Sequence, residues 1–184
     1  MIEKEIMGWH VIFAGFRNVK ISDPRALLDK VREASAAHIQ IFDADMIAGF
    51  NHIYFSVLNA LNAFNSGNRI SENLAVEVLL YASGQHQIRK AIEMLGVKSS
   101  STRILVVALS KIKDDALQAM HRVSKIVEGE QSDDVVEITD EKFEALKAAF
   151  EISDAELEAT LRKSRNEALT SVLIERSALL ITQA

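Results

Sequence analysis

The sequence predicts an α/β fold in which a small mixed or antiparallel sheet of three to four strands is packed by several helices. Residues 6–16, 38–43 and 103–109 are apolar stretches rich in β-branched and aromatic side chains, which favours strands. The segments between and after them place apolar residues three and four positions apart, which is typical of amphipathic helices. No internal repeat, low-complexity run or linker is visible, so we expect one domain over residues 1–184.

The chain is expected to open with a strand–helix–strand unit. Between the strands at 6–16 and 38–43, Asp23 is a suitable N-cap and Pro24 occupies the first helical position, where proline is tolerated. The leucines and valine that follow give this helix one apolar stripe.

Three helices are expected in the middle of the chain. The first runs from Met46 and ends near Gly67, which suits a left-handed cap. The second starts at Ser71 and ends at Ser83. The third begins at about Gln85, stops at Gly96 and is expected to bury four apolar residues, which are Ile88, Ala91, Ile92 and Leu95.

The unbroken apolar run at 103–109 predicts an interior strand covered on both faces. A helix over 112–128 and a polar loop at 131–134 follow, and residues 135–138 are a possible fourth strand. Asp140 begins another helix, Ser153 and Glu156 form a capping box, and a last helix without glycine or proline covers roughly 164–181.

The composition is that of a soluble cytoplasmic protein. Hydrophobic residues make up 48% and charged residues 26%, and the chain has no cysteine, which excludes disulfides and thiolate sites. The first residues are charged and of mixed sign, so we expect no signal peptide. The longest stretch without charge, 46–68, contains five asparagines, so we expect no membrane span.

The net charge of −5 is unevenly distributed. Residues 46–113 carry seven basic and three acidic side chains, whereas residues 114–184 are strongly acidic. A basic middle and an acidic end are consistent with two different partners, and also with ordinary variation of surface charge.

Motifs for catalysis and for cofactor binding are missing from the sequence. The glycines form no phosphate-binding loop and the five histidines have no metal-ligand spacing, so we expect no catalytic residue, no metal and no cofactor. Glu77 within an apolar run, together with His86, leaves a small enzyme open as a rival, although such a carboxylate more often anchors a helix.

Two features stand out as possible binding surfaces. At the expected start of the third helix, amide, imidazole and basic side chains accompany free backbone N–H groups, a combination suited to phosphate and bases; a solvated helix face is the alternative. On the last helix, apolar residues cover more than half of the circumference. Such a helix must either pack in the interior of its own domain or bind a partner.

The segment from Leu74 to Gly96 resembles a known family, the small PRPK-binding (TPRKB-like) subunits of the KEOPS/EKC complex. The matching residues are Leu74, Glu77, Leu79, Tyr81, Gly84, Gln87, Ile88, Ala91, Ile92 and Gly96, followed by residues 102–107. The likeness extends upstream over residues 42–61 and, more weakly, to residues 175–180.

This resemblance implies a subunit that is not an enzyme. Members of the family bind and stimulate the atypical PRPK-like kinase of a complex that installs threonylcarbamoyladenosine on transfer RNA, and they contact the remaining subunits indirectly. Archaeal-type members also hold the 3′ CCA tail of the transfer RNA. The expected nucleic-acid face is Arg69, Gln85, His86, Gln87, Arg89 and Lys90, and the expected kinase face is Leu169, Val172, Leu173, Arg176, Leu179 and Leu180. Within the first set, Gln87 matches the family signature directly, whereas Arg69, His86 and Lys90 are placed there by their charge. A kinase regulator without RNA contact remains the other alternative.

Overall fold

The computed structural model describes residues 1–33 and 35–183, and its contacts group into two compact units. Unit 1 comprises Met1–Ala44 and Gly96–Val135, and unit 2 comprises Asp45–Leu95 and Val136–Ala184. Strands are confined to the first unit, among the described residues, and both units contain helices. The predicted α/β class is confirmed, and the assignment of one domain stays a prediction.

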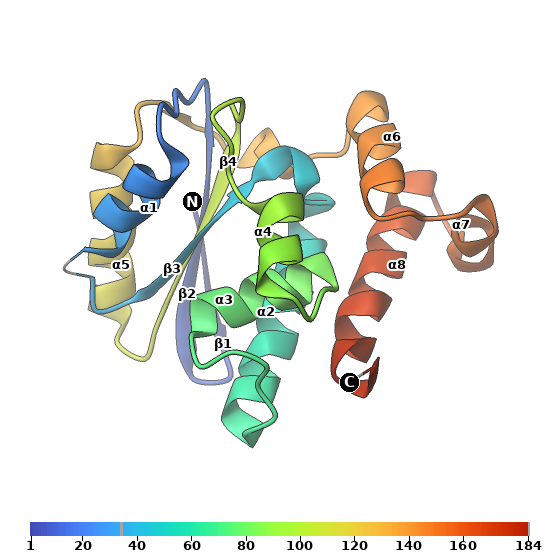
Figure 1. The fold of residues 1–184 in the computed structure, drawn as a ribbon, viewed down its shortest axis with the longest axis horizontal. Helices are drawn as coiled ribbons and strands as arrows, with labels where there is room; N and C mark the ends of the chain where they lie inside the picture. Colours follow the sequence, from blue (N-terminus) through green and yellow to red (C-terminus); the bar gives the residue numbers. More distant parts are fainter. Residues whose placement is uncertain (34, 184) are drawn as a thin grey trace. The chain divides into compact units, whose positions relative to one another are not determined.

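Unit 1 is an antiparallel sheet with two helices on one side. The strands β1 (Ile2–Ile6), β2 (Trp9–Arg17), β3 (His38–Asp43) and β4 (Ile104–Ser110) lie in the order β1-β2-β4-β3, and the short β5 (Glu130–Gln131) pairs with β2. Helices α1 (Pro24–Arg32) and α5 (Lys113–Ile126) cover the same face of this sheet (Figure 1).

The core of unit 1 lies between this face and the two helices. Alternate residues of β2, including Ile12 and Phe16, pack with Val31 of α1 and with Met120 and Val123 of α5. Every residue of β4 is buried, which confirms the prediction of an interior strand.

Two strand predictions were wrong. Residues 6–16 are not one strand: Ile6 ends β1, Met7 and Gly8 form a hairpin turn, and residues 9–16 belong to β2. Both turn residues adopt the positive φ that a two-residue turn between antiparallel strands requires. The possible strand at 135–138 is absent: residues 135 and 136 end the 3-10 helix η2 (Asp133–Val136), and residues 137 and 138 have no regular structure. Here the Asp133 carboxylate accepts the N–H of Gly15 at 3.3 Å, and the chain passes so close to Gly15 that a Cβ atom there would lie 2.2 Å from the Ser132 carbonyl oxygen.

Unit 2 is built around the long helix α2 (Gly49–Ser66), which packs against α3 (Leu74–Ser83) and α8 (Arg165–Leu179). Helix α4 (Ile88–Leu95) packs on α3, whereas α6 (Asp140–Ala149) and α7 (Asp154–Thr160) flank α8 (Figure 1). The chain ends in the short η3 (Leu180–Gln183). Within the described residues, each helix is too short or too polar to cross a membrane.

Local capping decides where these helices begin. The left-handed cap at Gly67 and the capping box of Ser153 and Glu156 are confirmed. Helix α3 begins at Leu74 rather than at Ser71, because the Asn73 side chain accepts the first free N–H groups. Helix α4 begins at Ile88 rather than at Gln85, so residues 85–87 lie before the helix and outside it.

Candidate functional site

A cavity of about 530 Å³ opens within unit 2, between the segment that contains α4, the end of α6 and helix α8. It is lined by Ala82, Ser83, Gly84, Gln85, Lys90, Glu93, Met94, Ala149, Phe150, Glu151, Leu173 and Arg176. Gln85 and Lys90 belong to the predicted nucleic-acid face, and Leu173 and Arg176 belong to the predicted kinase face. The structure therefore brings parts of the two predicted surfaces to one site.

The cavity combines both charges with an apolar wall. Lys90 and Arg176 are cationic, Glu93 and Glu151 are anionic, and the half-buried Met94 contributes apolar surface, with the buried Phe150 and Leu173 also in the lining. Glu93 lies 3.6 Å from Arg89 one turn away, whereas Lys90 has no ion-pair partner among the described residues. A ligand with an anionic group and a flat apolar group would find both kinds of contact here.

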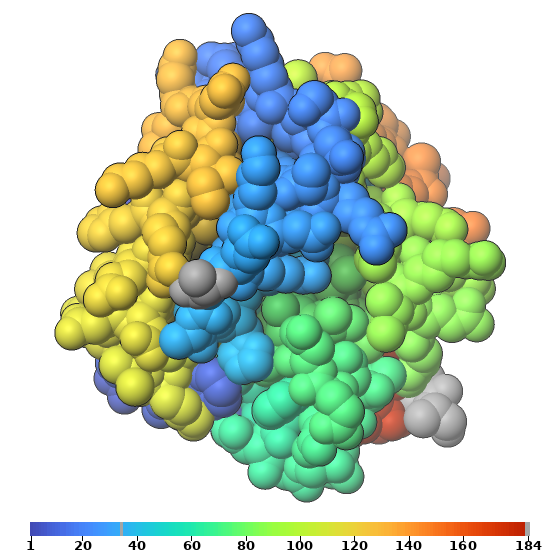
Figure 2. Space-filling view, turned by 60° about the vertical axis from the view of Figure 1, so that its left-hand side comes forward, coloured from blue at the N-terminus to red at the C-terminus, as the bar shows by residue number. Residues whose placement is uncertain are grey.

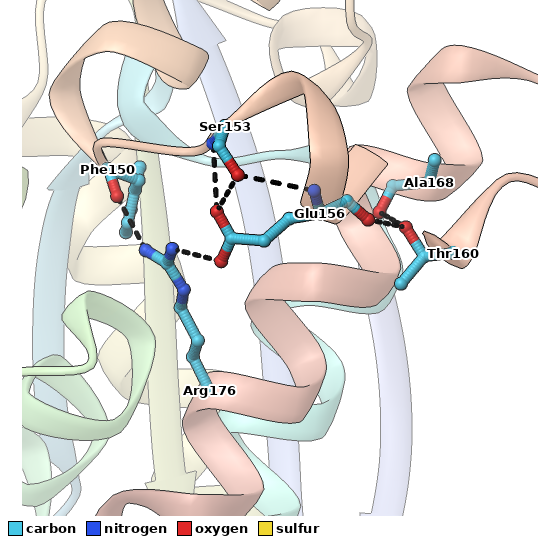
Figure 3. Close-up of polar contacts among 6 residues, drawn as sticks. All are labelled: Phe150, Ser153, Glu156, Thr160, Ala168 and Arg176. Atoms are coloured by element: carbon cyan, nitrogen blue, oxygen red, sulfur yellow. Dashed lines mark hydrogen bonds and ion pairs between the residues drawn. The ribbon is translucent and has the colours of Figure 1, made fainter. Parts of the chain in front are cut away.

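Arg176 is held by an internal network that Figure 3 shows. Its Nη1 donates to the Phe150 carbonyl oxygen at 2.5 Å, and its Nη2 donates to Oε1 of Glu156 at 2.7 Å. The other Glu156 oxygen accepts the Ser153 N–H at 2.8 Å. The Ser153 N–H, together with Arg176, lowers the pKa of the Glu156 carboxyl to about 2. Arg176 thus ties α8 to α7 and to the cavity wall at Phe150.

The exposed part of the predicted nucleic-acid face lies on and before α4. Gln87, Arg89 and Lys90 are exposed, and the yellow-green atoms of this segment stand at the surface in Figure 2. His86 is half-buried, and its Nε2 is buried without a hydrogen-bond partner. Amide and cationic groups are therefore available to a ligand along residues 85–90.

Most of the apolar stripe of α8 is inside unit 2. Leu169, Val172, Leu173 and Leu180 are buried, whereas Leu179 is 43% exposed, and Ala178 and Ile181 beside it are exposed too. The apolar residues of this helix were expected either to pack in the interior of the domain or to contact a partner. These four side chains pack in the interior. The exposed side chains of Ala178, Leu179 and Ile181 are the part that a partner could contact directly.

The family model of the kinase-binding protein CGI-121 matches residues 16–180, which include all of α4 and α8. The chain belongs to the CGI-121 family. It is also 29% identical, over 113 residues, to the regulatory protein Cgi121 of Methanocaldococcus jannaschii; this alignment spans 61% of the chain and 70% of the relative. The predicted resemblance to PRPK-binding subunits is thereby confirmed at the level of the family.

In this CGI-121 family member, two residues expected in the core are exposed. Ile88 and Ile92 are 45% and 52% exposed, whereas Ala91 and Leu95 are fully buried. The expectation that all four are buried was wrong, because α3 covers only one half of the apolar stripe of α4. Ile88 and Ile92 add apolar surface beside Arg89.

Arg69 lies apart from the other predicted nucleic-acid residues. Helix α3 separates it from Gln85, and the ten residues of this helix span about 15 Å. Its Nη2 lies 2.7 Å from Glu72 Oε2, and its guanidinium lies 5.3 Å from the centre of the Phe64 ring. The hydrogen bond and the charge of Glu72 raise the pKa of Arg69. Arg69 is not among the residues that line the cavity.

Glu77 anchors a loop. Its fully buried carboxylate accepts the N–H of Ile70 at 3.0 Å and that of Ser71 at 2.7 Å. Burial raises the pKa of this carboxyl, and the two N–H groups oppose that effect. Neither Glu77 nor His86 lines the cavity. The part of the chain that the structure describes contains no group of three or more histidine and acidic residues arranged for a metal.

Sequence reasoning missed the wall formed by Phe150 and Glu151. These residues follow α6, more than fifty positions after α4, and Glu151 has a positive φ of 51° at the end of that helix. No local pattern marks them as neighbours of Gln85, since only the packing of α6 and α8 places them there.

Proposed function

We propose that this CGI-121 family member is a non-catalytic adaptor of the cytoplasmic KEOPS complex. It binds and stimulates the atypical PRPK-like kinase of that complex, and it holds the 3′ CCA tail of transfer RNA for threonylcarbamoyladenosine modification. The observation that carries the proposal is the cavity that Gln85 and Lys90 share with Leu173 and Arg176. The family match supports the kinase as a partner.

The chemistry of the cavity and of α4 supports a single-stranded RNA ligand. Proteins bind single strands by placing cations along the backbone and flat or apolar groups against the bases. Arg89 and Lys90 supply the charge, Gln85 and Gln87 supply amides, and the half-buried Met94 supplies apolar surface in the wall. The volume of about 530 Å³ lies within the usual range for a small-ligand site.

The kinase face is assigned to the end of α8. Leu179 and Ile181 are the large exposed apolar side chains there, at 43% and 37%. A small exposed apolar group at a helix end fits a protein partner better than it fits RNA. The buried residues Leu169, Val172 and Leu173 contribute by fixing the helix that presents this group.

The RNA part of the proposal is tested with two transfer RNAs that differ only in their last three nucleotides. Stacking contributes roughly 1–3 kcal/mol per base, so removal of the CCA end should weaken binding at least about tenfold. The measurement is a filter-binding or fluorescence titration of the purified chain. Equal affinity for both RNAs would contradict the proposed site.

The same preparation tests the protein part. Added to the kinase, the chain should form a stable complex and raise the rate of ATP hydrolysis by the kinase. If the chain binds the kinase but does not retain transfer RNA, the alternative function is favoured, in which the chain regulates the kinase without contacting RNA.

A further inference from the structure

The cavity has one wall from each of the two proposed binding surfaces. The segment before and within α4 contributes Gln85 and Lys90, and α8 contributes Leu173 and Arg176. The walls meet at Gly84, where a Cβ atom would lie 4.0 Å from the Cβ of Arg176. A ligand in the cavity therefore contacts both segments at once.

A chain of close contacts connects the two walls behind the cavity. His52 lies 2.9 Å, Nε2 to oxygen, from the Ala82 carbonyl, and the His52 ring stands edge-on to Phe150 at 5.9 Å between ring centres. The Phe150 carbonyl oxygen in turn accepts the hydrogen bond from Arg176. The residue after Phe150 in the polypeptide is Glu151, which has a positive φ. The hydrogen bond from the Ile152 N–H to the Lys147 carbonyl stabilises this conformation.

Arg176 also stands next to the proposed kinase face. Leu179 follows it by three residues, about one helical turn, and Ala178 and Ile181 are exposed beside Leu179. Any contact that fixes the Arg176 side chain and the turn that carries it also fixes the position of Leu179.

We propose that the RNA and the kinase bind cooperatively, and that Arg176 couples them as a positioning residue. This inference rests on the proposed function. An RNA end in the cavity contacts the wall that contains Phe150 and Arg176, so it favours the arrangement of α8 in which these contacts form, and the kinase binds that arrangement more tightly. Linkage requires the converse, that the kinase tightens RNA binding by the same factor. Couplings of this kind are typically at least about fivefold.

The test measures the affinity of the full chain for the kinase, with and without a saturating short single-stranded oligonucleotide that ends in CCA. A short oligonucleotide replaces transfer RNA because the body of transfer RNA could touch the kinase directly. We expect the oligonucleotide to tighten kinase binding about fivefold or more in the wild type.

The decisive variant is Arg176→Met, which keeps the side-chain stem but removes both hydrogen bonds. It should reduce the coupling, which is the ratio of the kinase affinities with and without oligonucleotide, to less than about twofold. Because Arg176 lines the cavity, the variant also weakens binding of the oligonucleotide alone, so the ratio is measured at an oligonucleotide concentration that saturates the variant. Arg162→Met is the matched control, since Arg162 is exposed and outside the cavity lining, and it should retain the full coupling. If Arg176→Met does not fold, Glu156→Gln replaces it and should at least halve the coupling.

Three results would overturn the inference, and they differ in what they say about the function. If both ligands bind the wild type but with unchanged affinities, the coupling is wrong and the proposed function stands. If the coupling persists in Arg176→Met, it arises from direct contact between the ligands. If either ligand fails to bind the wild-type chain alone, the proposed function fails and the coupling fails with it.

Discussion

Helices α4 and α8 both carry an apolar stripe, and the structure uses the two stripes in opposite ways. On α4, Ile88 and Ile92 are about half exposed although their spacing predicts a core face. On α8, Leu169 and Leu173 are 0% and 3% exposed although they were assigned to a partner. Helical spacing therefore identifies a stripe, but it does not say whether the same chain or another molecule covers it.

The difference follows from the number of neighbours that each helix has. Helix α8 packs against α2, α3, α6 and α7, so neighbouring helices bury apolar residues on several of its faces. The eight residues of α4 pack mainly on α3, which covers Ala91 and Leu95 and leaves the other half of the stripe to solvent. The surface that is open to a partner is thus wider on α4 and narrower on α8 than the sequence predicts.

The largest expected effect is on the free energy of unfolding, and it should differ between the buried and the exposed leucines of α8. Leu173→Glu places a carboxylate in the interior without a partner and should cost more than about 4 kcal/mol, enough to unfold the chain or nearly so. Leu179→Glu should change the free energy of unfolding by less than about 0.5 kcal/mol and should weaken kinase binding. Urea unfolding and a kinase titration measure the two quantities.

Either of two outcomes would contradict this view of α8. A folded, stable Leu173→Glu variant would mean that Leu173 is not buried in the interior of unit 2. Unimpaired kinase binding by Leu179→Glu would move the kinase face away from the end of α8.

A somewhat smaller effect on the free energy of unfolding is expected from acid pH, through the buried His52, which connects the two sides of the cavity. Burial lowers the pKa of His52 to about 4; its hydrogen bond to the Ala82 carbonyl opposes this shift, and the charge of Lys142 adds to it. The unfolded chain, with an ordinary histidine pKa of about 6.5, takes up a proton that the folded chain does not. Stability should therefore be complete above about pH 6.5 and fall as the pH decreases towards 4, by about 2 kcal/mol at pH 5.

Urea unfolding at several pH values between 7 and 4.5 measures this dependence. His52→Gln should be less stable at neutral pH but should lose less stability on acidification, since the remaining carboxylates titrate in both proteins. An identical pH dependence in the two proteins would show that His52 is not the group responsible.

Much of the fold follows from local sequence signals. The apolar run of β4, the glycine cap of α2 and the capping box of α7 each depend on a few adjacent residues, and each is as predicted. The hairpin turn at Met7 was not predictable, because methionine rarely adopts positive φ and both flanking segments favour strands. The strand expected at 135–138 did not form because Val135 and Val136 belong to a 3-10 turn whose start the Asp133 side chain ties to Gly15, which outweighs the strand preference of the valines.

Less of the candidate site could be predicted. Gln85 and Lys90 stand out in the sequence because they accompany a helix start. Their neighbours Phe150 and Glu151 come from a segment with no such signal, and the role of Arg176 depends on two hydrogen bonds to residues twenty or more positions away. Contacts of this kind arise from tertiary packing, so the sequence predicted the two surfaces but not the cavity that joins them.

The most direct test of the adaptor account is the salt dependence of transfer-RNA binding by a charge-reversed α4. If three or four phosphates are contacted, the wild type should show a log–log slope of about −2 to −3, which is roughly a thirtyfold loss of affinity between about 50 and 200 mM salt. The double variant Arg89→Glu with Lys90→Glu should fold normally and lose this binding, whereas Arg162→Glu with Lys163→Glu, an exposed basic pair outside the cavity lining, should keep most of it. Unchanged affinity and slope in the α4 variant would contradict the account.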